Sequence, residues 1–225
     1  MWFGVLGPLM VKTDAGEVEV GPRQRRVLLC RLLVDANRVV SSDLLIDALW
    51  GDDPPLGAAA SLQAHISRLR TLLGGGVLVT RAPGYVLNVA DDSFDVAQFQ
   101  RLSLEGRQAA ASSQIDQAAD RLAQGLGLWR GEAYTGFDDS GFARAEAADL
   151  ALGAFDRAAV LIGSIDRLAE SGDIGDFVAR HDQLKAEAEK RLDSDKLEAA
   201  LARGRHMDPD GVHRLITQPA DPPSY

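Results

Sequence analysis

The sequence of 225 residues has few of the residues that cross-link or anchor a chain. Its single cysteine, Cys30, excludes an internal disulfide and any metal site built from thiolates alone. No apolar run approaches the length of about 18 residues that a membrane span requires. The first residues also lack the charged and apolar regions of a secretory signal. We therefore expect a cytoplasmic protein that does not associate with a membrane.

Recognisable catalytic patterns are missing as well. The glycine run at 74–76 is not followed by the Lys and Ser or Thr of a phosphate-binding loop. The His and Asp residues at 206–213 have the spacing of neither a zinc motif nor a calcium loop. No arrangement of nucleophile, base and acid stands out from the background. We predict no catalytic residue, no metal and no cofactor, and therefore a protein that is not an enzyme.

The charge of the chain is unevenly distributed. The formal net charge is −9, and lysine is scarce, so arginine supplies most of the positive charge. Residues 1–94 carry 9 basic and 10 acidic side chains, whereas residues 95–225 carry 15 basic and 23 acidic ones. Residues 23–81 hold 8 basic side chains against 5 acidic ones. This asymmetry predicts two domains with different partners.

The N-terminal part combines strand-type and helix-type patterns, which indicates an α+β fold. Three short β-type runs predict a small antiparallel sheet, and they lie at 3–6, 9–11 and 18–20. Three helical patterns follow, at 27–37, 41–51 and 57–73. Two more β-type runs, at 77–81 and 85–89, flank Pro83-Gly84 and predict a hairpin. The predicted order is sheet, three helices and hairpin.

The remaining chain is alanine-rich, and its pattern is helical throughout. Five helices are predicted, at 96–110, 114–128, 142–169, 176–191 and 193–203. They occur as consecutive pairs, which is typical of a stack of helical repeats. The proline-rich residues 218–225 predict a disordered tail.

The third predicted helix carries the clearest functional pattern. An apolar stripe of Leu62, Ile66, Leu69 and Leu73 directs one side of the helix into the core. The opposite side and its two edges are polar and basic, and they consist of Ser61, Gln63, Ala64, His65, Ser67, Arg68, Arg70 and Thr71. Such a helix fits the major groove of double-stranded DNA, where arginine pairs with guanine and glutamine with adenine.

A solvated helix face is the alternative interpretation of this side. The absence of acidic residues over the helix and the following hairpin argues against it. Arg68 is the expected base reader. His65 has three interpretations: a phosphate contact, a base contact or packing at the edge of the helix.

The predicted hairpin offers a second group of DNA contacts. Arg81 directly precedes the turn, where it is placed to enter a narrow, electronegative minor groove. Thr80 and Tyr85 can donate hydrogen bonds to phosphates, although Tyr85 can equally pack beneath the hairpin. Arg25, at the start of the first helix, is a candidate for a backbone contact or for plain solvation.

Several motifs, in this order, resemble the Streptomyces antibiotic regulatory protein family. They are FGVLGPL at 3–9, GPRQRRVLL at 21–29, ANRVVS at 36–41, LIDALWGDDPP at 45–55, LQAHISRLR at 62–70, RAPGY at 81–85, FDVAQF at 94–99 and AQGLGLWRG at 123–131. The resemblance extends to about residue 161. It implies a winged helix of the response-regulator output type, followed by an all-α, tetratricopeptide-like bacterial transcriptional activation domain.

The resemblance also implies a function and its partners. Members of the family bind direct repeats in DNA near biosynthetic promoters, often as two protomers side by side, and activate transcription through the RNA polymerase holoenzyme. The residues that occupy positions of the recognition helix or of the wing are Gln63, Ala64, Ser67, Arg68, Arg70 and Arg81. The domains implied are a DNA-binding domain at 1–92 and a helical domain at 93–217, which is shorter after Glu187 than the family pattern.

A protein-interaction adaptor is the alternative function. In that case the helical repeats would bind a partner, and the winged helix would have lost DNA binding. An adaptor would tolerate acidic or apolar residues on the third helix, where the sequence has arginines.

Overall fold

A computed structural model describes residues 1–112, 114–137, 139–150, 198–199 and 202. The helix predicted at 176–191 and the tail at 218–225 lie outside the described residues. So do most of the helix predicted at 193–203 and the part of 142–169 beyond Leu150. Two compact units divide the chain. The first comprises Met1–Ala97 together with Tyr134–Ala147, and the second begins with Gln98–Ala133.

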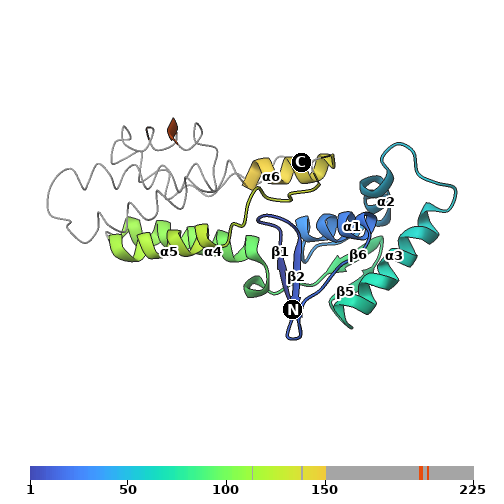
Figure 1. Cartoon of the computed structure of the whole chain (residues 1–225), viewed down its shortest axis with the longest axis horizontal. Helices are drawn as coiled ribbons and strands as arrows, with labels where there is room; N and C mark the ends of the chain where they lie inside the picture. The colour runs from blue at the N-terminus through green and yellow to red at the C-terminus, as the bar shows by residue number, and fades with distance from the viewer. Residues whose placement is uncertain (113, 138, 151–197, 200–201, 203–225) are drawn as a thin grey trace. The chain divides into compact units, whose positions relative to one another are not determined.

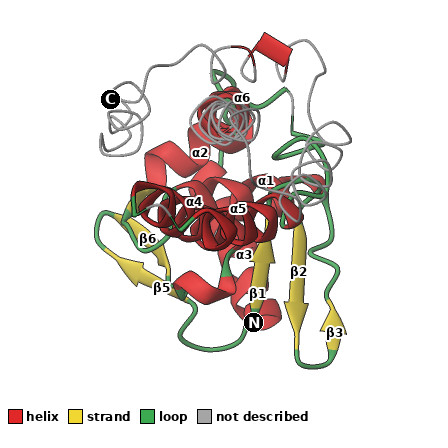
Figure 2. Cartoon of the chain, turned by 90° about the vertical axis from the view of Figure 1, so that its left-hand side faces the viewer, coloured by secondary structure: helices red, strands yellow, loops and turns green. Residues whose placement is uncertain are grey.

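The first unit opens with a three-stranded antiparallel sheet of β1 (Trp2–Gly4), β2 (Met10–Thr13) and β3 (Gly16–Glu17), in that spatial order (Figure 2). Phe3 pairs with Val11, and both side chains are buried. The third strand predicted at 18–20 is wrong by about two residues. The tight turn pairs Thr13 with Gly16, so β3 begins at Gly16 and not at Val18. A hydrogen bond from Val18 N to Val11 O at 2.8 Å continues the pairing beyond β3.

Three helices form the core of the first unit (Figure 1): α1 (Arg23–Val34), α2 (Ser42–Trp50) and α3 (Ala58–Leu73). The helix α1 is buried along most of its length, which matches its continuous apolar run. The helix α2 begins as predicted, because the Ser41 hydroxyl accepts a hydrogen bond from Leu44 N at 3.2 Å. In α3 the four predicted stripe residues are its buried residues, so the inward side of this helix is confirmed.

A second antiparallel sheet has the order β4 (Val40–Ser41), β6 (Gly84–Leu87) and β5 (Leu78–Arg81). The predicted hairpin is confirmed as β5 and β6, whereas β4 was not predicted. Gly84 explains how the short β4 strand fits. A Cβ atom at Gly84 would lie 1.8 Å from Val40 O, so only glycine lets the two backbones pair here. Two small antiparallel sheets packed with three helices make this part winged-helix-like.

Segments beyond the hairpin complete the first unit. Asp95, at the start of α4 (Asp95–Ala111), is fully buried, and its carboxylate accepts hydrogen bonds from Val5 N at 2.8 Å and Leu6 N at 2.9 Å. The buried Tyr134 donates its backbone N–H to Val5 O at 2.8 Å. The chain thus returns to the N-terminal sheet from residue 134, and α6 (Gly141–Leu150) follows.

The second unit contains an antiparallel helix pair formed by α4 and α5 (Ile115–Gly127). Small residues allow the close approach of these helices. A Cβ at Gly106 would lie 3.0 Å from the Leu122 side chain, and one at Gly125 would lie 3.4 Å from Phe99. Phe99 also packs edge-to-face on Trp129, with ring centroids 5.4 Å apart. None of the described helices has the length and hydropathy to cross a membrane.

Candidate nucleic-acid interface

The outward side of α3 is polar and solvent-accessible, as the sequence predicted. Its apolar stripe fixes this orientation, because the stripe residues are all buried. Five of the predicted side chains are exposed: Gln63, Ala64, Ser67, Arg68 and Thr71. Three predicted residues at the edges are half-buried: Ser61, His65 and Arg70. The exposed side therefore consists of three small residues, one glutamine and one arginine.

Arg68 and Arg81 are the two exposed arginines of this region. In the described part of the chain, neither guanidinium takes part in an ion pair or a hydrogen bond with another side chain. No Asp or Glu occurs between Asp53 and Asp91, so no nearby carboxylate in sequence neutralises them. Both charges are available to an anionic partner.

His65 lies in a positively charged environment at the junction of α1 and α3. Partial burial lowers the pKa of His65, and the positive charges of Arg25 and Arg68 lower it further. The imidazole is therefore biased toward its neutral form in the free protein. Three predicted site residues are thereby near one another: His65, Arg25 and Arg68.

The Arg25 side chain folds back on the residues just before α1. Its Nη1 donates to Val20 O at 3.1 Å, and its guanidinium covers Gly21. Gly21 has a φ of +91°, a left-handed conformation that favours glycine, and a Cβ there would lie 2.9 Å from Arg25 Nη1 and displace the end of that side chain. The arginine side chain is half-buried as a result.

Arg70 connects the last turn of α3 to both strands of the hairpin. Its Nε donates to Leu78 O at 2.9 Å, and its Nη2 donates to Thr80 Oγ1 at 2.7 Å. The guanidinium also lies over the Tyr85 ring, 5.8 Å from the centroid. Thr80 on β5 and Tyr85 on β6 are register partners. We call the group of Arg70, Thr80 and Tyr85 the hairpin clamp.

The predicted site residues thus fall into two groups. Ser67, Arg68 and the other outward residues of α3 lie on one helix face, while the hairpin clamp joins that helix to the hairpin that carries Arg81. Thr71 makes a local bond instead, because its hydroxyl donates to Ser67 O at 3.2 Å. Helical periodicity places Arg70 at the edge of the face, but it gives no information about the partner of the guanidinium.

Asn37 is a structural residue of this region that sequence reasoning missed. Its side-chain amide donates to Val89 O and accepts from Val89 N, both at 2.9 Å, and its backbone N–H donates to Leu87 O. Asn37 has a φ of +67°, a conformation that asparagine tolerates better than most residues. The only sequence signal was an asparagine at the predicted end of a helix.

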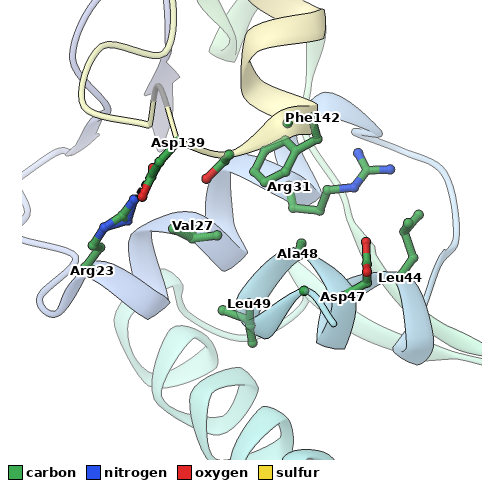
Figure 3. A pocket seen from close by; sticks show the side chains of 12 residues that line it. Arg23, Val27, Arg31, Leu44, Asp47, Ala48, Leu49, Asp139 and Phe142 are labelled. Carbon is green, nitrogen blue, oxygen red and sulfur yellow. Dashed lines mark hydrogen bonds and ion pairs between the residues drawn. The ribbon is translucent and has the colours of Figure 1, made fainter. Parts of the chain in front are cut away.

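Two further arginines of the basic stretch face a groove instead (Figure 3). A cavity of about 450 Å³ lies between α1, α2 and residues 139–142. Arg23 forms an ion pair with Asp139 at its edge. Arg31 pairs with Asp35 at 2.7 Å and lies over the Phe142 ring. These two arginines are engaged within the protein, whereas Arg68 and Arg81 have no such ion pair among the described residues.

Comparison with family profiles identifies two matching regions. The family described as bacterial transcriptional activator domain matches residues 94–208, which is half of the chain. The family described as transcriptional regulatory protein, C terminal, matches residues 15–87.

The individual relatives match between 57% and 60% of the chain. The transcriptional regulatory protein EmbR of Mycobacterium tuberculosis is 40% identical over 135 residues, which is 57% of this chain and 35% of EmbR. The regulatory protein AfsR of Streptomyces coelicolor is 39% identical over 135 residues, covering 60% of this chain and 14% of AfsR. The regulatory protein DnrI of Streptomyces peucetius is 35% identical over 144 residues, covering 59% of this chain and 53% of DnrI.

A solved structure extends the similarity. The structure of Mycobacterium tuberculosis EmbR in complex with a low-affinity phosphopeptide matches with a TM-score of 0.68 and 28% identity. The match covers 96% of this chain and 68% of that one. In sequence, the matched region spans 35% of EmbR and 14% of AfsR.

Proposed function

Because the chain belongs to the Streptomyces antibiotic regulatory protein family of transcriptional regulators, we propose that it is a sequence-specific DNA-binding activator of a biosynthetic gene cluster. It binds direct repeats near a promoter in double-stranded DNA, in the cytoplasm. The observation that carries the proposal is the acid-free outward side of α3 together with the hairpin, where Arg68 and Arg81 are exposed and unpaired among the described residues.

The proposed contacts divide between base reading and positioning. Arg68 reads a base in the major groove, since arginine pairs bidentately with guanine O6 and N7. Arg81 enters the adjacent minor groove. Gln63, Ser67 and His65 lie on or beside the same face and supply base or phosphate contacts.

The affinity of one protomer is modest under this proposal. Residues 23–81 carry a net charge of only +3, and Arg23 and Arg31 are paired with carboxylates. Binding that depends on a few arginine–phosphate contacts falls steeply with salt concentration. A second protomer on the neighbouring repeat raises the affinity through effective concentration.

The region after residue 92 is proposed to act on protein partners. Residues 95–225 have 23 acidic against 15 basic side chains, so their charge opposes contact with phosphates. The antiparallel pair of α4 and α5, with its small residues at the helix contact, is consistent with a tetratricopeptide-like helical domain. We propose that this domain contacts the RNA polymerase holoenzyme or the second protomer.

Selection of bound duplexes from random-sequence DNA, followed by footprinting, tests the proposal directly. The full chain is expected to enrich a repeated half-site and to protect two adjacent segments. A variant with Arg68→Ala and Arg81→Ala is expected to lose enrichment. The control variant Arg101→Ala removes an exposed arginine of α4 that pairs with Glu105, and its enrichment is expected to equal that of the wild type.

Retention on heparin at low salt separates DNA binding from the adaptor alternative. If the wild type and the Arg68→Ala, Arg81→Ala variant are retained equally and no duplex is enriched, the chain is an adaptor. The polymerase contact has its own test. Holoenzyme added to the complex of full chain and selected duplex is expected to form a slower-migrating species in a gel, and its absence would refute that contact alone.

A further inference from the structure

We propose that Arg70 does not read DNA but fixes the hairpin relative to α3, so that it acts on binding through Arg81. This inference rests on the proposed function and assigns one residue of that same site to a positioning role. It changes the sequence-based interpretation, in which Arg70 is a contact residue of the recognition helix.

The geometry of the guanidinium carries the inference. Nε and Nη2 of Arg70 are both directed at β5, to Leu78 O and Thr80 Oγ1, and the plane also covers Tyr85 on β6. Arg70 thus touches both strands of the hairpin at once, and it is half-buried. Two of the five N–H donors of the guanidinium are thereby engaged within the protein, and these bonds direct its plane at the hairpin instead of at a base edge.

The position of Thr80 links the clamp to the wing arginine. Thr80 directly precedes Arg81 on β5, and Arg81 pairs with Gly84 in the register of the hairpin. A bond at Thr80 therefore constrains the backbone from which Arg81 projects. Arg68 lies two residues before Arg70 on α3, so the clamp spans the elements that present both exposed arginines.

A planar fork with several donors is needed for this arrangement. Lysine carries the same charge, but its three donors radiate from a single nitrogen and it has no planar face, so it does not reproduce two bonds to separate acceptors together with the stacking on a ring. The variant Arg70→Lys is consequently expected to behave like Arg70→Ala, whereas a residue that only supplied positive charge would be rescued by lysine.

A double-mutant cycle on the full chain tests the positioning role. Affinity is measured for a fluorescently labelled duplex recovered by the random-sequence selection. Arg70→Ala is expected to weaken binding about tenfold in the wild-type background but by less than about twofold in the Arg81→Ala background. A loss of stability, or an independent contact of Arg70 with DNA, would lower affinity by the same factor in both backgrounds, and such additivity would overturn the inference.

The matched control is the pair Arg68 and Arg81. Arg68→Ala is expected to be additive with Arg81→Ala, because neither side chain contacts the other among the described residues. Thr80→Val, which removes the hydroxyl acceptor, is expected to couple with Arg81→Ala as Arg70→Ala does, and Thr80→Ser is expected to restore affinity.

Amide hydrogen exchange of the free protein tests the clamp without DNA. Arg70→Ala is expected to speed exchange in β5 and β6 and to leave α1 unchanged. If Arg70→Ala speeds exchange but the wild-type chain enriches no duplex, the clamp is supported and the proposed DNA-binding function is refuted. Unchanged exchange with additive affinities in a protein that does bind DNA would refute the positioning role alone.

Discussion

The first unit contains two helical regions of opposite charge. The acidic region, Ser42–Gly57, consists of α2 and the loop after it, and it has four exposed aspartates and no Lys or Arg. The basic region, Ala58–Leu87, consists of α3 and the hairpin, and it has three arginines and no Asp or Glu. Each helix packs by its apolar side, with Leu45 buried in α2 and the four stripe residues buried in α3.

The difference shows that packing and surface chemistry are specified by different residues. Apolar spacing decides which side of either helix is buried, and it would serve equally well with the charges exchanged. The outward residues decide what each side can bind. Leu44 and Leu56, which are 40% and 108% exposed, add apolar surface to the acidic region, whereas the outward side of α3 is small and polar.

Reversing the charge of the basic region is expected to have the largest effect. Arg68→Glu combined with Arg81→Glu replaces two attractive charges by two repulsive ones and is expected to lower DNA affinity by more than about 100-fold. Fluorescence anisotropy at low salt measures the change. Asp43→Ala with Asp47→Ala in the acidic region is the control, and a comparable loss in that variant would show that the two regions do not differ in this role.

Removing one base reader is expected to have an intermediate effect. Arg68→Ala should cost about 1–3 kcal/mol of specific binding free energy and relax the preference at one base position. Competition with single-position variants of the selected duplex reads out both quantities. A uniform loss across all duplexes would mean that Arg68 contacts a phosphate.

The start of each helix gives a comparison in stability. The helix α2 has a side-chain cap from Ser41, whereas α3 follows Gly57 and has no side-chain cap. Ser41→Ala is expected to lower the free energy of unfolding by about 0.5–2 kcal/mol. Urea denaturation provides the measurement, and Ser67→Ala on the exposed side of α3 is the control with an expected change near zero. An equal change in both variants would contradict a capping role.

The smallest expected effect is a pH dependence from His65. Its pKa is lower in the folded chain, so the unfolded chain binds more protons at intermediate pH, and acidification favours unfolding. The loss begins as the pH falls below the unfolded pKa of about 6.5 and is complete below the folded pKa. Thermal melts of wild type and His65→Gln across this range test it, and parallel pH profiles would exclude a contribution from His65.

Local signals in the sequence predicted the elements of the interface. The stripe of α3, the cap at Ser41 and the turn at Pro83-Gly84 each depend on residues close in sequence. The strand β4 was missed because it has two residues and exists only by pairing with β6. The acceptors of the Arg70 guanidinium were also not predicted. Helical periodicity indicates on which face of the helix a Cβ lies, but it does not indicate which groups the end of a long side chain contacts.

Long-range packing was the other part that the sequence did not predict. The division at 92 and 93 separates Asp95 and Tyr134 from the N-terminal sheet, although both bond to Val5. From the neighbouring residues in the sequence alone, Asp95 cannot be told apart from any other aspartate at the start of a helix, although its buried carboxylate accepts bonds from two backbone amides. The assignment of domains at 1–92 and 93–217 remains a prediction.

The return of the chain at Tyr134 makes residues 98–133 an excursion with both ends fixed in one folded body. A domain on a single linker can separate when that linker is cut, but an excursion of this kind cannot. A protease nick between α4 and α5 would leave two fragments, each holding part of the first unit, and they would remain associated through the bond from Tyr134 N to Val5 O, the burial of Tyr134 and the ion pair of Arg23 with Asp139. Cleavage at that site would therefore be visible only after denaturation.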